Sequence, residues 1–148
     1  MQFTIGELAK KAKLSADTIR FYEKKQLIRP PLRADNNYRY YDQDSLTRLV
    51  FIRHCRELGM SLKEIQALHE QLQEPEQNCV HVNEVIRDHL HHVTEKINQL
   101  EQFKVQLEQL EKSCQANASV KDCEIIQALQ RPDDRDDPLT LSRLDLHA

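Results

Sequence analysis

The first residues of the chain alternate apolar and polar positions with the spacing of two short helices joined by a tight turn. Thr4 can cap the first helix, with Glu7 three residues later, and Ser15 can cap the second. The apolar positions of the second helix are Ile19, Tyr22 and Leu27. The pattern predicts either a helix-turn-helix, whose second helix enters the major groove of DNA, or an ordinary helical hairpin.

Two asparagines and three β-prone tyrosines lie in residues 33–41, after two prolines end the second helix. Asn36 and Asn37 tolerate the positive φ of a tight turn, so the segment predicts a β-hairpin. Arginine and tyrosine side chains of this hairpin can donate to DNA phosphates. They are Arg33, Tyr38, Arg39, Tyr40 and Tyr41. The alternative is a packed aromatic hairpin, and we expect at least one tyrosine in the core.

Two more short helices and one long helix follow. Asp42 can cap a third helix, and Ser61 with Glu64 forms a capping box for a fourth. No Pro or Gly interrupts residues 78–113, which predict one helix of about 50 Å at 1.5 Å per residue. Its apolar positions follow a heptad spacing that Lys104 interrupts. They are Ile86, Leu90, Val93, Ile97, Leu100 and Leu107. Such a narrow stripe needs a partner, and the simplest is the same helix of a second chain in an antiparallel homodimer.

Composition and charge narrow the class of protein. The chain of 148 residues has 30% charged residues, no Trp and two Gly, which favours long solvated helices over a deep core. Residues 1–60 carry a net charge of +5 and residues 61–148 carry −8. A polyanion partner is therefore expected for the first part only. No signal sequence and no membrane-spanning run are visible, so we expect a cytoplasmic protein with reduced cysteines.

Three cysteines form a candidate metal site. Cys114 and Cys123 bracket a loop and can converge on one ion, and Cys79 at the other end of the long helix would reach the partner's loop in an antiparallel dimer. Three thiolates favour soft or borderline ions, namely Cd²⁺, Pb²⁺, Hg²⁺ or Zn²⁺. The alternative is three unconnected cysteines. Cys55 is expected to be a packed side chain.

Other chemistry is less well supported by the sequence. His54 and Cys55 project about 100° apart on a helix and cannot form a catalytic dyad, so we predict that the chain is not an enzyme. An iron–sulfur switch would need four clustered cysteines. The histidines of the long helix could supply a nitrogen ligand or a secondary metal site, but they are expected on its solvated surface, and His81, near Cys79, is the first candidate among them. The other three are His89, His91 and His92.

The predicted fold is mainly α-helical. A winged helix-turn-helix DNA-binding domain occupies residues 1–74, and a long antiparallel coiled-coil dimerisation helix occupies residues 78–113. A short metal-binding loop and a short terminal helix follow in residues 114–130. Residues 131–148 are rich in Asp and Pro and predict a disordered tail.

The segments IGELAKKA, TIRFYEKKQLI, YRYY and LVFIRHCRELGMSLKEI, with the long helix and the cysteine loop, resemble the MerR family of metal-responsive transcription regulators over residues 3–129. The resemblance implies that five side chains touch operator DNA. They are Thr18, Arg20, Tyr22, Tyr38 and Arg39. It also implies activation of a heavy-metal resistance or efflux promoter, where metal binding distorts the DNA for RNA polymerase. Asn37 stands where the family's wing more usually has Gly.

Within the family, the thiol at position 79 implies a divalent-ion sensor rather than a copper or gold sensor. The zinc type carries a doubled cysteine and a histidine in the loop, whereas Gln115 follows Cys114 here and the loop has no His. The chain therefore resembles the cadmium and lead branch, with Cys79, Cys114 and Cys123 as ligands. Zn²⁺ and Hg²⁺ remain the alternative effectors.

Overall fold

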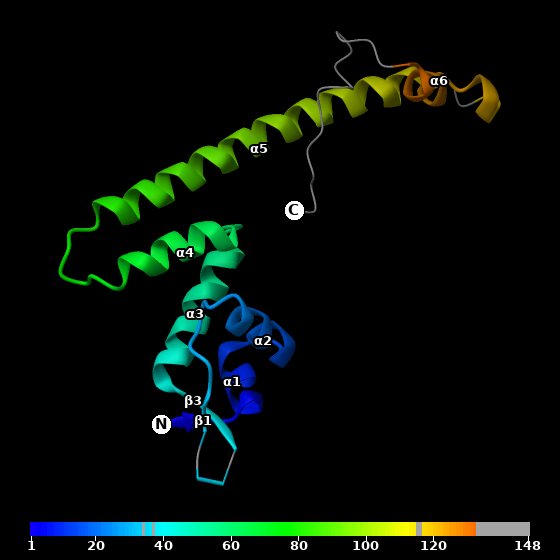
Figure 1. Ribbon diagram of the computed structural model, residues 1–148. Coiled ribbons are helices and arrows are strands. Elements are labelled where there is room, and N and C mark those ends of the chain that lie inside the picture. Colours follow the sequence, from blue (N-terminus) through cyan, green and yellow to red (C-terminus); the bar gives the residue numbers. More distant parts are fainter. Residues whose placement is uncertain (34, 37, 115–116, 133–148) are drawn as a thin grey trace. The chain divides into compact units, whose positions relative to one another are not determined.

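The computed structural model describes residues 1–33, 35–36, 38–114 and 117–132 (Figure 1). The chain divides into two compact units, of which the first is Met1–His89 and the second begins at Leu90. The turn residue Asn37, Gln115 of the cysteine loop and most of the predicted tail lie outside the described residues. No helix in the part that the structure describes is long and apolar enough to cross a membrane.

The first unit begins with the helix-turn-helix that the sequence predicts. Helix α1 is Ile5–Ala12 and helix α2 is Ala16–Lys24. The Thr4 hydroxyl oxygen accepts from the amide of Glu7 at 3.2 Å, and the Ser15 hydroxyl oxygen accepts from the amide of Thr18 at 3.0 Å. Each cap satisfies an amide that a helix start leaves free, which fixes where the two helices begin. Helix α2 ends earlier than expected, so Leu27 packs in the core from the loop.

A small antiparallel sheet completes the DNA-binding half. Strands β2 (Leu32–Arg33) and β3 (Arg39–Asp42) form the predicted hairpin, and β1 (Gln2–Phe3) pairs with the other edge of β3. The sequence pattern does not predict β1. Its two residues are too few to show an alternating pattern, and only pairing across the sheet defines it.

Helices α3 (Gln43–Glu57) and α4 (Leu62–Gln71) follow, as their caps predict. Asp42 accepts from the amide of Ser45 at 2.9 Å. Ser61 and Glu64 form the complete capping box, in which each side chain binds the other residue's amide.

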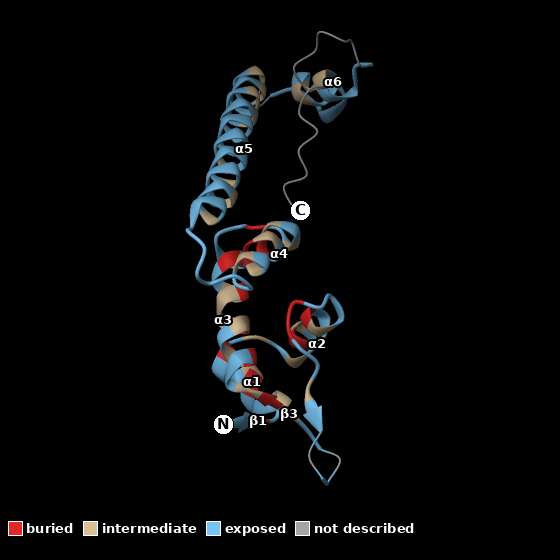
Figure 2. Ribbon diagram, turned by 60° about the vertical axis from the view of Figure 1, so that its left-hand side comes forward, coloured by how far each residue is buried: buried red, intermediate tan, exposed pale blue. Residues whose placement is uncertain are grey.

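The buried core lies wholly in the first unit, on α1 to α4, β1, β3 and the loops between them (Figure 2). Its residues are Phe3, Leu8, Ala12, Ile19, Tyr22, Leu27, Ile28, Tyr41, Leu49, Ile52, Cys55, Met60, Ile65 and Leu68. The expectations that Cys55 packs inside and that at least one hairpin tyrosine is core are therefore confirmed.

Helix α5 (Val80–Ser113) is the long predicted helix. Its first turns belong to the first unit, where Val82 and Val85 pack against the core. The compact unit thus extends beyond the predicted domain end at residue 74. The 3₁₀ turn η1 (Val120–Asp122) and helix α6 (Glu124–Gln130) follow, and neither they nor α5 contain a buried residue.

Candidate nucleic-acid interface and metal centre

Helix α2 presents Arg20 to solvent. The Arg20 side chain is 58% exposed and pairs with the almost fully exposed Asp17 at 3.1 Å. An exposed ion pair of this kind contributes about 0–1 kcal/mol, so little opposes a move of the guanidinium to a phosphate or base. Thr18 is half-buried, and its hydroxyl lies 2.7 Å from that of Ser15. Thr18 is therefore part of the helix cap as well as a candidate contact.

Tyr22 differs from the other predicted DNA contacts. It is only 6% exposed and belongs to the core, with its ring 5.7 Å from that of Phe21. A DNA contact by Tyr22 stays a prediction, and it is limited to what this small exposed surface can reach.

The hairpin presents Tyr38 and Arg39. Tyr38 is 67% exposed, and its amide donates to the Asn36 side chain at 3.2 Å, which shapes the turn. The Arg39 side chain is 59% exposed and lies 3.7 Å from Glu23 of α2. One carboxylate thus links the wing to helix α2.

Glu23 also accepts a hydrogen bond from the buried Tyr41 hydroxyl at 2.9 Å. Burial, the hydrogen bond to Glu23 and the charge of Glu23 together raise the pKa of Tyr41 to about 12, although the charges of Arg39 and Arg20 act in the opposite direction. The phenol therefore keeps its proton and remains a donor. The result is a fixed Glu23 carboxylate that orients Arg39 beside α2.

Arg20 and Arg39 line the same open groove, which has a volume of 1470 Å³. The fold therefore brings together two residues that are far apart in the sequence. Other cationic side chains line this groove from α2, α3 and the loop between α2 and β2. The sequence pattern does not mark them as candidate contacts. They are Lys24, Arg29 and Arg48. Together with Arg20 and Arg39 they outnumber the acidic residues of the lining, Asp17, Glu23 and Asp44, and we call this surface the basic groove. Because the cationic residues lie on separate elements, no spacing could have grouped them.

The three candidate thiols lie at the ends of α5 and at the start of α6. Cys79 is exposed and directly precedes α5, and its carbonyl accepts from Asn83 at 3.0 Å. Cys114 is exposed directly after α5, and Cys123 is partly exposed at the start of α6. Cys79 belongs to the first unit and the other two to the second. Cys55, in contrast, is buried, and burial raises the pKa of its thiol.

The histidines of α5 are not alike. His81 and His91 are exposed, with side chains 64% and 71% accessible, and each lies near a glutamate of its own helix. The His89 side chain is only 13% accessible and lies 3.0 Å from Glu64. The expectation of a surface position is therefore wrong for His89, because α4 covers it.

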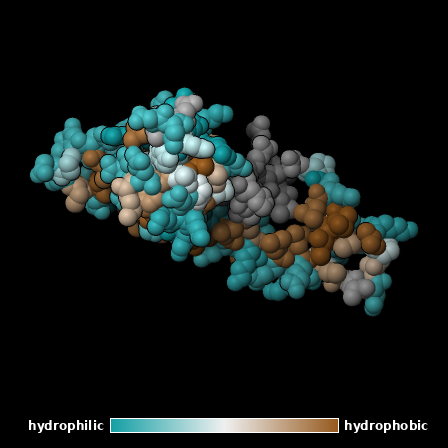
Figure 3. Space-filling model, turned by 90° about the horizontal axis from the view of Figure 1, so that it is seen from below, coloured by the Kyte–Doolittle hydropathy of each residue, from teal (hydrophilic) through white to brown (hydrophobic). Residues whose placement is uncertain are grey.

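Helix α5 leaves five of its six predicted heptad positions exposed, and the sixth, Val93, is partly exposed. Ile86, Leu90, Ile97, Leu100 and Leu107 are each between 44% and 63% exposed. Figure 3 shows hydrophobic side chains gathered on an open face of the protein. A long helix with an exposed apolar stripe and no buried residue is typical of half of a helical dimer.

The winged helix-turn-helix, the basic groove and the long apolar-striped helix together define a DNA-binding regulator. The family models agree with this class. The model described as "MerR HTH family regulatory protein" matches residues 3–72, and the one described as "MerR, DNA binding" matches residues 46–110. The chain belongs to the MerR family of transcription regulators and is not an enzyme.

Individual relatives support a metal-responsive branch. The transcriptional regulator ZntR of Escherichia coli is 37% identical over 132 residues, covering 87% of this chain and 93% of its own. The mercuric resistance operon regulatory protein of Bacillus cereus is 34% identical over 88% of this chain and 99% of its own. The crystal structure of PbrR691 from Ralstonia metallidurans in complex with lead(II) has a TM-score of 0.78 and 38% identity, covering 86% and 98% of the two chains.

These likenesses establish a metal-responsive transcriptional regulator. MerR regulators bind promoter DNA as dimers and contact RNA polymerase, so the partners expected from the sequence are confirmed at the level of the family. The mercuric regulator and the lead(II) complex name two different metals, and these names do not select one metal for this chain.

Proposed function

We propose that this protein is a cytoplasmic activator of a heavy-metal resistance or efflux promoter and that Cd²⁺ or Pb²⁺ is its effector. The observation that carries the proposal is that three accessible thiols lie at the two ends of α5 and at the start of α6. Cys79 lies before α5, Cys114 lies after it, and Cys123 lies at the start of α6. Soft thiolate ligands select these ions over Mg²⁺ or Ca²⁺.

The proposed site is shared between two chains. A straight helix of 34 residues spans about 50 Å, so thiols at its two ends are too far apart for one ion. Antiparallel pairing of two α5 helices would place Cys79 of one protomer beside Cys114 and Cys123 of its partner. The exposed apolar stripe of α5 supports such pairing.

The DNA-binding part of the proposal rests on the basic groove. Arg20 and Arg39 would contact the operator together with Thr18 and Tyr38, and a smaller contact is left for Tyr22. Metal binding would change the geometry of the bound dimer and so deform the promoter toward a form that RNA polymerase can use.

In vitro transcription from the protein's own promoter tests the effector. Cd²⁺, Pb²⁺, Zn²⁺ and Hg²⁺ are titrated in competing chelator for the wild type and for Cys79→Ser, Cys114→Ser and Cys123→Ser. We expect Cd²⁺ or Pb²⁺ to activate at lower free concentration than Zn²⁺ and each substitution to abolish activation. Cys55→Ala is the matched control, since it removes a buried thiol outside the site. Stronger activation by Zn²⁺ or Hg²⁺ would support the alternative effectors that ZntR and the mercuric regulator suggest.

Mixed dimers test whether the site is shared. A Cys79→Ser protomer and a Cys114→Ser protomer each lack an essential thiol, yet together they contain one complete shared site. We expect metal binding at one site per mixed dimer, whereas neither variant binds alone. If each protomer built its own site, the mixture would bind no better than its parents.

Substitutions in the groove test the DNA contact. Arg39→Ala and Arg20→Ala should each weaken operator binding by about 1–3 kcal/mol and leave metal binding intact. Lys121→Ala, which changes a cation of η1, is the control. Loss of metal binding in the arginine variants would point to a folding defect.

A further inference from the structure

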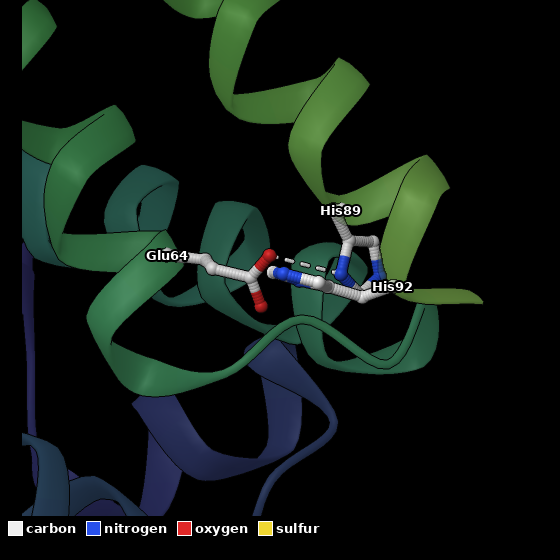
Figure 4. A group of neighbouring side chains, drawn as sticks. All are labelled: Glu64, His89 and His92. Atoms are coloured by element: carbon white, nitrogen blue, oxygen red, sulfur yellow. Dashed lines mark hydrogen bonds and ion pairs between the residues drawn. The ribbon is translucent and has the colours of Figure 1, made fainter. Parts of the chain in front are cut away.

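His89 joins the start of α5 to helix α4. Its Nδ1 atom lies 3.0 Å from a carboxylate oxygen of Glu64, and its side chain is 13% accessible. Figure 4 shows the imidazole of α5 and the carboxylate of α4 facing one another. Both residues belong to the first unit.

The other nitrogen of the same ring reaches the end of α3. Nε2 of His89 lies 2.8 Å from the carbonyl oxygen of Leu58, the residue that caps α3. Gly59 follows with φ +78°, and a β-carbon there would lie 4.0 Å from Nε2. The turn between α3 and α4 is therefore shaped so that the carbonyl of Leu58 faces the imidazole.

Both partners of the His89 ring are acceptors. A carboxylate and a carbonyl oxygen each accept hydrogen bonds, so each ring nitrogen of His89 faces an acceptor. Burial acts to raise the pKa of Glu64, but hydrogen bonds from Ser61 and the charge and hydrogen bond of His89 lower it overall. The Glu64 carboxylate thus remains charged as the partner of His89.

Glu64 also takes part in the N-terminal cap of α4. One of its oxygens accepts from the amide of Ser61 at 2.9 Å and completes the capping box of α4, while the other faces His89. Val82 and Val85 pack the same turns of α5 against the core. One side chain of α5 therefore contacts both ends of the α3–α4 connection in the DNA-binding unit.

We infer that His89 is a positioning residue that transmits a change in α5 to the DNA-binding unit, by holding the carboxylate of Glu64 and the carbonyl of Leu58 at once. The inference rests on the proposed function. It differs from a role in DNA or thiolate contact, because His89 lies at neither site. Without the imidazole, α5 would lose two directed contacts, to Glu64 and to the carbonyl of Leu58, whereas the apolar packing of Val82 and Val85 has little directional preference.

The central variant is His89→Ala, with His91→Ala as the matched control because His91 is an exposed histidine of the same helix. Thiolate occupancy is followed by the ultraviolet charge-transfer absorbance of bound Cd²⁺, which reports sulfur ligands alone. We expect His89→Ala to keep this titration and its operator affinity, yet to lose roughly tenfold of its metal-induced transcription. Full activation by His89→Ala, or loss of thiolate binding together with activation, would overturn the inference.

Two conservative variants separate the two halves of the contact. The amide of His89→Asn can replace Nδ1 toward Glu64, and the longer amide of His89→Gln can replace Nε2 toward Leu58. We expect each to restore part of the activation and neither to restore all of it. Glu64→Gln should lower activation in the wild type and have little further effect in His89→Ala, because the two residues act through one contact. Independent, additive effects would contradict this.

Hydrogen exchange tests the contact without metal or DNA. The amides of residues 82–89 should exchange faster in His89→Ala than in the wild type or His91→Ala, while those of α1 and α2 should not change. Unchanged exchange in residues 82–89 would refute the contact. A wild type that responds to no metal would instead refute the proposed function, and the exchange result would still decide whether His89 holds α5.

Discussion

The two units of this chain differ in how far their apolar side chains are buried. Met1–His89 encloses a core of fully buried side chains such as Leu8, Leu49 and Ile65. From Leu90 to Gln130, none of the described residues is buried, although the heptad positions of α5 are apolar. The first unit therefore has a core of its own to stabilise its fold, whereas the apolar stripe of α5 in the second unit needs another protein surface to cover it.

Because of this difference, the stability of the DNA-binding unit and the stability of the paired α5 helices depend on protein concentration in different ways. A unit with its own core has a stability that is independent of protein concentration, whereas a helix that is covered only in a dimer depends on mass action. The proposed thiolate site would then exist only in the assembled dimer.

Core truncation in the first unit should have the largest effect. Leu49→Ala removes a fully buried side chain and should lower the free energy of unfolding of the first unit by about 2–5 kcal/mol. Urea denaturation followed by circular dichroism, at two protein concentrations, measures it. Leu107→Ala, at a 63% exposed position of α5, is the control. Equal losses in the two variants would contradict the contrast between the units.

A charge on the α5 stripe should separate the protomers without unfolding the first unit. Leu100→Glu replaces an apolar side chain at a heptad position, and a two-fold dimer loses it twice. The dissociation constant should rise by on the order of a hundredfold, as sedimentation equilibrium would show. Gln99→Glu adds the same charge at the neighbouring position. Dimers that tolerate Leu100→Glu but not Gln99→Glu would place the interface on another face.

Removal of a helix cap should have a smaller effect that is confined to the first unit. Ser61→Ala deletes the hydroxyl that accepts from the amide of Glu64 at 3.1 Å and should cost about 1 kcal/mol. Chemical denaturation of the full chain measures this loss. Ser119→Ala, which changes the residue before η1, should leave the unfolding of the first unit unchanged. A similar loss in Ser119→Ala would indicate that the units unfold together.

Acid sensitivity should reveal the cap of α3. The hydrogen bond from the backbone amide of Ser45 lowers the pKa of Asp42, outweighing the opposite effect of burial. A carboxyl group whose pKa is lower in the folded than in the unfolded state stabilises the fold at pH values above its unfolded-state pKa. This stabilisation is lost as the pH falls through the folded-state pKa. Asp42→Asn can still cap the helix but does not titrate. Its free energy of unfolding should therefore fall less than that of the wild type between about pH 5 and about pH 3. If the free energy of unfolding of Asp42→Asn depended on pH as steeply as that of the wild type, the result would contradict the stabilising role of the Asp42 cap.

The amino-acid sequence determined the elements of this protein through short-range rules. Thr4, Ser15, Asp42 and Ser61 cap helices as expected, because a cap needs only residues three positions apart. The heptad spacing of α5 and its freedom from Pro and Gly likewise predicted the long helix. The same local patterns and the cysteines supported the family that the comparisons confirm.

Tertiary structure decided which side chains meet. It put Tyr22 and Tyr41 in the core and left Tyr38 exposed, although all three are tyrosines in candidate DNA-binding segments. It brought Arg20 and Arg39 to one groove. It also turned His89 from an expected surface residue into a contact that joins three helices. These outcomes depend on the packing of elements distant in sequence, and a period of three or four residues contains no information about which elements pack together.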